Sequence, residues 1–284
     1  MRKTYPIDRF QSLQTPLYYY DVDLLKNTLG IINDEINKHN NFIVHYAIKA
    51  NANPALLRII SNAGLGADCV SGGEINIACQ TGFEPSKIVF AGVGKSDWEI
   101  NLALDKGIYC FNVESMAELE VINMLANKKN TVARVALRIN PDVDAHTHAN
   151  ITTGLAENKF GISLTDMNDV VKSAMKMDCI EFIGLHFHIG SQIQDMSVFK
   201  SLCERINEII SCFEKAGIII SDINVGGGLG IDYDNPEENC IPDFKAYFDT
   251  YSTYLNIGSN KRVHFELGRA VVGQCGTLIT KTLY

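Results

Sequence analysis

Short apolar runs alternate along the chain with longer segments in which apolar residues recur every three or four positions. The run FIVHYAI at 42–48 is apolar on both of its alternating phases, which is typical of a strand buried on both faces of a sheet. Comparable runs predict further strands at 65–69, 88–91, 108–113, 132–139, 180–189, 223–225 and 263–266. The amphipathic segments between them predict helices at 74–81, 97–106, 115–127, 166–176, 196–216 and 243–256, with another that Pro54 opens.

Strands that alternate with helices at this spacing predict parallel βαβ units, and eight such strands predict a closed (β/α)8 barrel of the TIM type. A helix capped by Asp21 and extending to about residue 39 precedes the first barrel strand. This helix is expected to complete the outer ring, since no helix follows the eighth strand. We therefore expect an α/β protein whose barrel domain comprises residues 21–266.

Both ends of the chain depart from this alternation. Residues 17–20 form a β-like run, and Val271 and Val272 are typical of a strand. A single strand cannot bury its own face, so residues 1–20 and 267–284 are expected to be portions of a second, β-rich domain. With so few residues that domain is expected to be incomplete, its remainder being absent from this sequence.

The composition of the 284 residues narrows the class of protein. A hydrophobic content of 46% with 20% charged residues is typical of a globular chain with a substantial core. The net charge of −8, without a block of Lys and Arg, argues against nucleic acid and anionic membranes as partners. No apolar run approaches the ~20 residues of a membrane span. The eight cysteines stand singly, which favours a reducing cytoplasm over a disulfide framework or a zinc site.

Chemically distinctive residues lie at the ends of the predicted strands or just after them, and the active site of such a barrel lies at these strand ends. In chain order they are Lys49, Asp68, Glu74, Arg138, His188, Gly226, Gly227, Gly228, Glu266 and Arg269. Any one of them is ordinary on its own. Their common position predicts one shared site.

Lys49 closes the first predicted strand. Burial of an ammonium group is costly or lowers its pKa, and a lysine of lowered pKa can form a Schiff base. The alternative is a lysine that reaches solvent at the strand end. The three glycines at 226–228 offer unobstructed backbone amides to a phosphate, although such runs also form ordinary tight turns. A lysine and a phosphate site together indicate pyridoxal 5′-phosphate (PLP) as the cofactor.

His188 and Glu266 have roles consistent with that cofactor. His188 could stack on the pyridine ring, or it could be a core histidine bonded to a neighbouring strand. A carboxylate beside the ring nitrogen keeps the nitrogen protonated, through a contact worth up to roughly 4 kcal/mol. A protonated ring withdraws electrons strongly, so Glu266 favours decarboxylation over simple proton exchange. The alternative is a structural ion pair between Glu266 and Arg269.

The motifs YAIKAN, ADCVSGGE, HFHIGSQ, GGGLG and FELGR occur in this order. Together they resemble the fold-type III PLP-dependent decarboxylases, which have an alanine-racemase-like barrel. Within this family, RINPDVDAHTHANITTGLAENKFGI at 138–162 and the glutamine of HIGSQ resemble the diaminopimelate decarboxylase group. The resemblance covers essentially the whole chain.

The resemblance implies that Lys49 holds PLP, that His188 stacks on its ring and that Glu266 contacts the ring nitrogen. The implied cofactor-binding set also includes Asp68, Ser191, Gly226, Gly227, Gly228, Gly268 and Arg269. The implied partners of the substrate carboxylate are Arg269 and Arg138, because a guanidinium can bind a carboxylate through two parallel hydrogen bonds. The implied reaction is loss of CO2 from the D-centre of meso-2,6-diaminopimelate to give L-lysine, the last step of lysine biosynthesis, in a cytoplasmic homodimer.

The sequence departs from the family pattern in two places. Leu267 stands where the family has proline, which removes a fixed φ but no chemical group. Family members continue beyond the position of Tyr284 through a β domain that carries further substrate-binding residues and a cysteine offered across the dimer. Cys275, in QCGTL, does not match that cysteine motif. The 284-residue chain is therefore expected to bind PLP but to be poorly active.

Three other functions remain open from the sequence. A non-enzymatic PLP-carrier barrel needs the lysine and the phosphate site alone, and a related PLP-dependent amino-acid decarboxylase needs a different substrate. A metal-dependent hydrolase could use His186 and His188, which are spaced like ligands on one face of a strand. The strands that follow offer few further ligands. His146 and His148 lie in a polar segment and are expected to be solvated.

Overall fold

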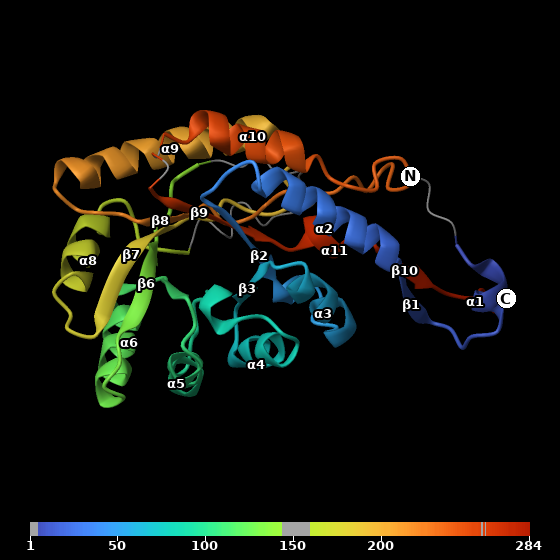
Figure 1. Ribbon diagram of the computed structural model, residues 1–284, viewed down its shortest axis with the longest axis horizontal. Coiled ribbons are helices and arrows are strands. Elements are labelled where there is room, and N and C mark those ends of the chain that lie inside the picture. The colour runs from blue at the N-terminus through green and yellow to red at the C-terminus, as the bar shows by residue number, and fades with distance from the viewer. Residues whose placement is uncertain (1–4, 144–159, 257, 259) are drawn as a thin grey trace.

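The computed structural model describes residues 5–143, 160–256, 258 and 260–284. Its centre is a closed barrel of parallel strands in the order β2-β3-β4-β5-β6-β7-β8-β9 (Figure 1). The strands are β2 (Phe42–Ala47), β3 (Gly66–Cys69), β4 (Ile88–Phe90), β5 (Cys110–Val113), β6 (Ala133–Arg138), β7 (Ile180–His186), β8 (Asp222–Asn224) and β9 (Arg262–Leu267). The predicted (β/α)8 barrel is confirmed.

Helices surround the barrel, and their ends carry the expected sequence signals. They are α2 (Val22–Ile36), α3 (Pro54–Asn62), α4 (Gly72–Gln80), α5 (Asp97–Lys106), α6 (Met116–Lys128), α8 (Met167–Ala174), α9 (Met196–Lys215) and α10 (Phe244–Tyr254). The Asp21 side chain accepts a hydrogen bond from the backbone N–H of Leu24 at the start of α2, as the cap prediction requires. In Figure 1, α9 and α10 lie side by side over one side of the barrel, and α4, α5 and α6 follow the opposite side.

The inside of the barrel changes character along its axis. A small apolar layer is formed by Val89, Cys110, Ala136 and Ile183. Near the amino-terminal ends of the strands lies a polar layer instead. There His264 is hydrogen-bonded to His45 at 2.9 Å and to Asp222 at 2.9 Å, and all three are buried. These bonds join β2, β8 and β9, so this end of the barrel is closed by hydrogen bonding.

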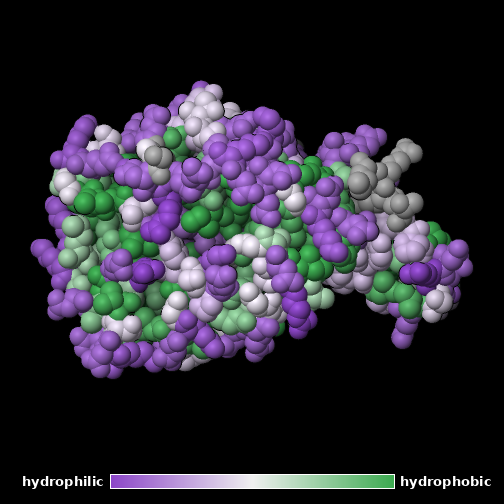
Figure 2. Space-filling view, in the orientation of Figure 1, coloured by the Kyte–Doolittle hydropathy of each residue, from purple (hydrophilic) through white to green (hydrophobic). Residues whose placement is uncertain are grey.

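The segments outside the barrel form a small projection at one side of the molecule (Figure 1). Strand β1 (Leu17–Tyr20) pairs antiparallel with β10 (Gly276–Ile279), and α1 (Ile7–Gln11) precedes them in the chain. The space-filling view shows apolar side chains at the surface of this end, where Ile7 and Leu278 are exposed (Figure 2). The two-stranded sheet agrees with the expectation that both chain ends contribute to one β-rich unit, while the division into two domains stays a prediction.

The expectation of a strand at Val271 and Val272 is wrong. Both residues lie in the short helix α11 (Arg269–Val272), which directly follows β9. Both side chains are buried in the main core, and α11 packs against α2. Burial in this turn therefore outweighs the strand preference of valine. None of the helices in the described part of the chain combines the length and the apolar character that crossing a membrane requires.

Candidate active site

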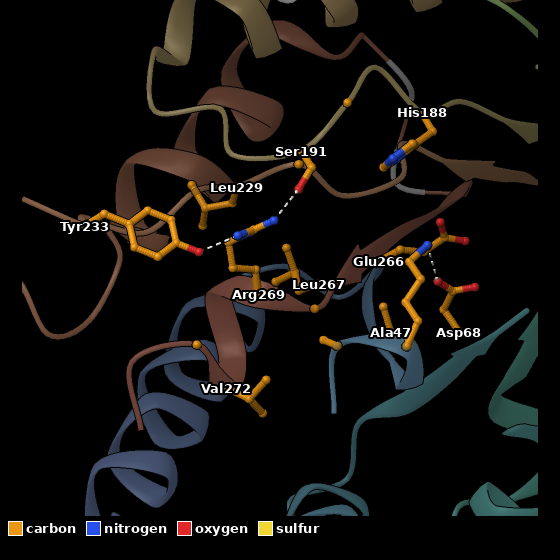
Figure 3. Close-up of a pocket in the computed structure, with 16 residues that line it drawn as sticks. Ala47, Asp68, His188, Ser191, Leu229, Tyr233, Glu266, Leu267, Arg269 and Val272 are labelled. Atoms are coloured by element: carbon orange, nitrogen blue, oxygen red, sulfur yellow. Dashed lines mark hydrogen bonds and ion pairs between the residues drawn. The ribbon is translucent and has the colours of Figure 1, made fainter. Parts of the chain in front are cut away.

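A cavity of about 550 Å³ opens at the carboxyl ends of the barrel strands. Its lining includes Lys49, Asp68, His188, Gly190, Ser191, Gly228, Tyr233, Glu266, Gly268 and Arg269. Figure 3 shows two ends to this space: Asp68, His188 and Glu266 lie at one, and Ser191, Tyr233 and Arg269 at the other. The structure thus brings most of the predicted site residues into one cavity.

Lys49 lies just beyond the first barrel strand. It belongs to the single turn η1 (Ile48–Ala50), and its side chain is 56% exposed. Of the two possibilities left open by the sequence, a buried ammonium and a lysine that reaches solvent, the structure shows the second, because the chain leaves β2 before it reaches Lys49. The Lys49 Nζ lies 3.9 Å from Asp68 Oδ2. Lys49 thus reaches the cavity from its rim, where a cofactor aldehyde can approach it.

Asp68 is the most isolated carboxyl group of the cavity. Its side chain is 1% exposed, and its Oδ1 has no hydrogen-bond partner among the described residues. Burial, followed by the negative charge of Glu266, raises the pKa of Asp68 to about 8, against the opposing charge of Lys49. Asp68 therefore carries a proton at neutral pH in the cofactor-free protein.

The raised pKa of Asp68 predicts a stability that falls with increasing pH. The unfolded carboxyl group titrates near 3.8, so between that pH and about 8 the folded protein holds a proton that the unfolded chain lacks. The resulting stabilisation is complete below the unfolded pKa and is lost as the pH rises through about 8. We expect the Tm of the cofactor-free protein to fall between about pH 4 and pH 8 and to level off above that range. Asp68→Asn should flatten this slope, and an unchanged slope in that variant would assign the effect to another group.

Glu266 is held by three hydrogen-bond donors. Its Oε1 accepts from Asn112 Nδ2 at 3.0 Å and from Asn224 Nδ2 at 2.7 Å, and its Oε2 accepts from His186 Nε2 at 3.2 Å. Burial by itself raises the pKa of Glu266, but the contact with His186 and the nearby Lys49 outweigh it and hold the pKa well below the usual range. Glu266 is therefore an ionised carboxylate.

The alternative role of Glu266, an ion pair with Arg269, is not formed. Among the described residues no ion pair joins these two side chains. The Arg269 guanidinium instead donates to the Tyr233 hydroxyl and, at 3.5 Å, to Ser191 Oγ. Its Nε is buried and has no partner among the described residues. Arg269 lines this end of the cavity, and a guanidinium group there is suited to an anion.

The glycine run forms a tight turn packed against its neighbours. Gly226 has φ +71° and Gly228 φ +110°, both in the left-handed region. The Gly226 N–H donates to Asn224 Oδ1 at 2.9 Å, and the Gly227 N–H donates to His188 Nδ1 at 3.4 Å. Of the three glycines, Gly228 alone is among the cavity-lining residues. The N–H groups of Gly226 and Gly227 are thus used within the fold, and Gly228 is the glycine of the turn that lines the cavity.

Gly227→Ala is expected to destabilise the protein strongly. A Cβ at this position would lie 1.9 Å from the backbone oxygen of Glu266, so one of two barrel strands would have to move. We expect a loss of about 3 kcal/mol in the free energy of unfolding, the upper part of the range for overpacked cores. Gly30→Ala in α2 is the matched control, because a Cβ there meets no atom within 4 Å. It should stabilise the protein by about 0.5–1 kcal/mol. Chemical denaturation of both variants measures the difference, and equal effects would contradict it.

Three residues that hold Glu266 were not predicted as site residues from the sequence. Asn112, Asn224 and His186 are buried at the ends of β5, β8 and β7, and they lie 154, 42 and 80 residues from Glu266 in the chain. Asparagine in an otherwise apolar strand was the available signal, since a buried amide needs a partner. His186 faces Glu266 rather than a metal position. Among the described residues no three His, Cys, Asp or Glu side chains gather to hold a metal ion.

Other predicted residues lie outside the cavity lining. Arg138 is buried and forms an ion pair with Glu114 at 2.7 Å. Glu74 accepts a hydrogen bond from the backbone N–H of Val70 at the start of α4. His146 and His148, with most of the loop after Arg138, lie outside the described residues. The substrate-binding role of Arg138 therefore stays a prediction.

The glutamine of HIGSQ, Gln192, bonds to the loop that follows the glycine turn. Gln192 Nε2 donates to the backbone oxygen of Ile231 at 2.6 Å, and its Oε1 accepts from the Ile231 N–H at 3.1 Å. Gln194 Nε2 donates to the same oxygen at 2.8 Å. The loop after β7 and the loop after β8 are thus joined by side-chain hydrogen bonds at the edge of the cavity.

The residues present fit PLP as the cofactor. A cavity of about 550 Å³ is within the usual range for a molecule of this size. One end offers Lys49 and the ionised Glu266, and the other offers the Arg269 guanidinium beside Ser191 and Gly228. An aldehyde, a basic ring nitrogen and a phosphate require groups of these kinds.

Comparison with known proteins gives a consistent result. A family model described as pyridoxal-dependent decarboxylase, pyridoxal binding domain, matches residues 31–273. A diaminopimelate decarboxylase of Bacteroides thetaiotaomicron is 61% identical over 284 residues, which are 100% of this chain and 74% of that protein. The one from Helicobacter pylori strain J99 is 40% identical over 277 residues, 97% of this chain and 67% of that protein.

Solved structures show the same similarity. The crystal structure of Helicobacter pylori diaminopimelate decarboxylase complexed with L-lysine has a TM-score of 0.90 at 37% identity and covers 98% of this chain and 69% of that one. The M. jannaschii enzyme in co-complex with L-lysine has a TM-score of 0.84 at 34% identity and covers 98% of this chain and 67% of that one. The chain therefore spans roughly two thirds to three quarters of these relatives.

Proposed function

The chain belongs to the diaminopimelate decarboxylase family of PLP-dependent enzymes, and from this premise we propose that it releases CO2 from the D-centre of meso-2,6-diaminopimelate to give L-lysine. The pyridoxal-binding domain indicates PLP as the cofactor. The observation that carries the proposal is the cavity in which Lys49 and an ionised Glu266 lie at one end and Arg269 at the other.

Each end of the cavity has a part in holding the cofactor. We assign Lys49 to the aldehyde group, Glu266 to the ring nitrogen and His188 to the face of the ring. Ser191, Gly228, Gly268 and Arg269 are assigned to the phosphate, with Gly226 and Gly227 shaping the turn. PLP, when bound, supplies an electron-withdrawing ring that accepts the electron pair left by CO2.

In the proposed reaction, Glu266 holds one proton and Lys49 transfers another. Glu266 is kept ionised by its three donors, and when PLP is bound this carboxylate would hold a proton on the ring nitrogen. Lys49 Nζ returns a proton to the substrate Cα after CO2 has left. Asp68 carries a proton of its own at neutral pH in the cofactor-free protein, which weakens its charge interaction with Lys49 Nζ, 3.9 Å away.

Substrate recognition and assembly are further parts of the proposal. Arg269 and Arg138 are proposed to bind the substrate carboxylate, and the active form is proposed to be a homodimer. A cytoplasmic location is proposed on the state of the thiols: among the described residues, which include all eight cysteines, no disulfide is formed. The relatives are longer than this chain, so the 284-residue form is proposed to bind PLP more readily than it turns over substrate.

The test is spectroscopic and then catalytic. The purified protein is titrated with PLP and followed by absorbance, and CO2 release from meso-diaminopimelate is then measured for the 284-residue form beside a form extended with a family carboxyl-terminal region. We expect PLP uptake by both forms and faster turnover by the longer one. PLP uptake without CO2 release by either form would favour a carrier, and no PLP uptake by either would contradict the proposal.

A further inference from the structure

The Asn224 side chain makes one hydrogen bond to Glu266 and another to the glycine turn. Its Nδ2 donates to Glu266 Oε1 at 2.7 Å, and its Oδ1 accepts from the Gly226 N–H at 2.9 Å. The carboxylate can only accept and the backbone N–H can only donate, so these partners fix the orientation of the amide group. The side chain is 4% exposed, so water competes little for either bond.

The two groups that Asn224 joins belong to different ends of the proposed cofactor site. Glu266 is assigned to the ring nitrogen, and the turn that begins at Gly226 is assigned to the phosphate. The same two segments are also joined through the backbone, where the Glu266 N–H donates to the Gly226 oxygen at 2.8 Å. At the next position, Gly227 approaches Glu266 so closely that a Cβ would not fit. Turn and carboxylate therefore form one packed unit.

Asn112 provides the internal comparison. Its Nδ2 also donates to Glu266 Oε1, at 3.0 Å, but it does so from β5, on the opposite side of the barrel from β9. Its backbone oxygen accepts from Lys95 Nζ at 2.8 Å, so Asn112 is anchored away from the glycine turn. Of the two groups, the Asn112 side chain contacts only Glu266, whereas the Asn224 side chain contacts both Glu266 and the glycine turn.

We propose that Asn224 is a positioning residue that sets the glycine turn and the Glu266 carboxylate at a fixed separation, so that both ends of one rigid cofactor are met at once. The proposal rests on the function proposed above. PLP is a rigid ring with a short phosphate arm, so a site that misplaces one end relative to the other loses contacts at both. Asn112 and His186 hold the carboxylate, while Asn224 also holds the turn.

The test compares three variants in the cofactor-free protein with two separate measurements. Protein labelled with 13C at the glutamate carboxyl groups reports the ionisation of Glu266, whose signal is identified by its absence in Glu266→Gln. Affinity for inorganic phosphate, measured by calorimetry, reports the state of the turn. Asn224→Leu removes both bonds, Asn224→Asp keeps an acceptor for Gly226 but repels Glu266, and Asn112→Asp repels Glu266 alone. PLP uptake by the unchanged protein is measured in parallel.

The variants should separate the two functions of Asn224. In Asn224→Asp and Asn112→Asp the added negative charge should raise the pKa of Glu266 into the neutral range. Both variants should keep the phosphate affinity of the unchanged protein. Asn224→Leu should weaken phosphate binding by about tenfold, the effect of losing one hydrogen bond of about 1.4 kcal/mol. Wild-type phosphate affinity in Asn224→Leu would overturn the proposal, and Asn224→Ala gives the same comparison if the leucine variant does not fold. Failure of the unchanged protein to take up PLP would instead contradict the proposed function.

Discussion

Replacement of Lys49 by alanine is expected to abolish covalent attachment of the cofactor and to lower kcat by roughly 10³-fold or more, because removal of a reacting nucleophile has costs up to about 10⁶-fold. The lysine lies at the rim of the cavity with its side chain 56% exposed, so its removal leaves no buried gap. Stability should change little. Borohydride reduction of the PLP-loaded protein followed by peptide mass analysis should find a pyridoxyl group on Lys49 in the parent and none in the variant.

Lys95 is the structural control for this assignment. Its side chain is 1% exposed, and its Nζ donates to the backbone oxygens of Gly92 and Asn112, both at 2.8 Å, and to Glu118 at 2.6 Å. All three ammonium protons are thus used, so this amine is not available to an aldehyde. Lys95→Ala should therefore destabilise the protein without loss of labelling. A pyridoxyl group found on Lys95, or labelling that survives in Lys49→Ala, would overturn the assignment of Lys49.

The sequence predicted the barrel well because each strand carries its own signal. A strand such as β2 is apolar on both phases, and that pattern depends on its immediate neighbours in the chain rather than on distant contacts. The position of Lys49 at the strand end followed from the same run. Its exposure did not, because the pattern does not show that the chain turns into η1 at Ile48. The strand predicted at Val271 and Val272 was wrong for a related reason, because burial in the core determined the conformation of these two residues.

The support around Glu266 is the part that sequence reasoning could not assemble. Asn112 is 154 residues from its partner and reaches it across the inside of the barrel. Its interaction depends on closure of all eight strands and on their register, neither of which is a local property. A buried asparagine in a strand indicates that a partner exists but does not identify it. The sequence thus indicated that Lys49 and Glu266 share one site, whereas the side chains that hold Glu266 could be found only from the fold.

Glu266→Gln is expected to slow decarboxylation far more than it weakens PLP binding. Glutamine keeps the shape of the side chain but removes its charge, so it no longer holds a proton on the ring nitrogen of bound PLP. We expect kcat to fall by roughly 10²- to 10³-fold, the usual cost of removing one preorganised electrostatic contact. PLP should be retained, because Lys49 and the phosphate-binding residues at the other end of the cavity are unchanged. Turnover of meso-diaminopimelate in the extended form and dialysis against PLP-free buffer measure the two quantities.

A glutamine at position 266 also changes the hydrogen bonds of its neighbours. A control variant at a second carboxylate, Glu118, distinguishes this loss of stability from a loss of catalysis. The new amide can accept from Asn112 and Asn224 through its oxygen, but its NH2 group faces His186 Nε2, so the His186 ring has to carry its proton on the buried Nδ1 instead. Glu118→Gln is the control, because Glu118 is also buried and paired, with Lys95 at 2.6 Å, but lies outside the cavity lining. Both variants should lose stability, since each removes one partner of a buried charge-assisted bond. Only Glu266→Gln should have a lower kcat when the rate is calculated per folded molecule. A kcat equal to that of the parent would mean that ring protonation does not depend on Glu266.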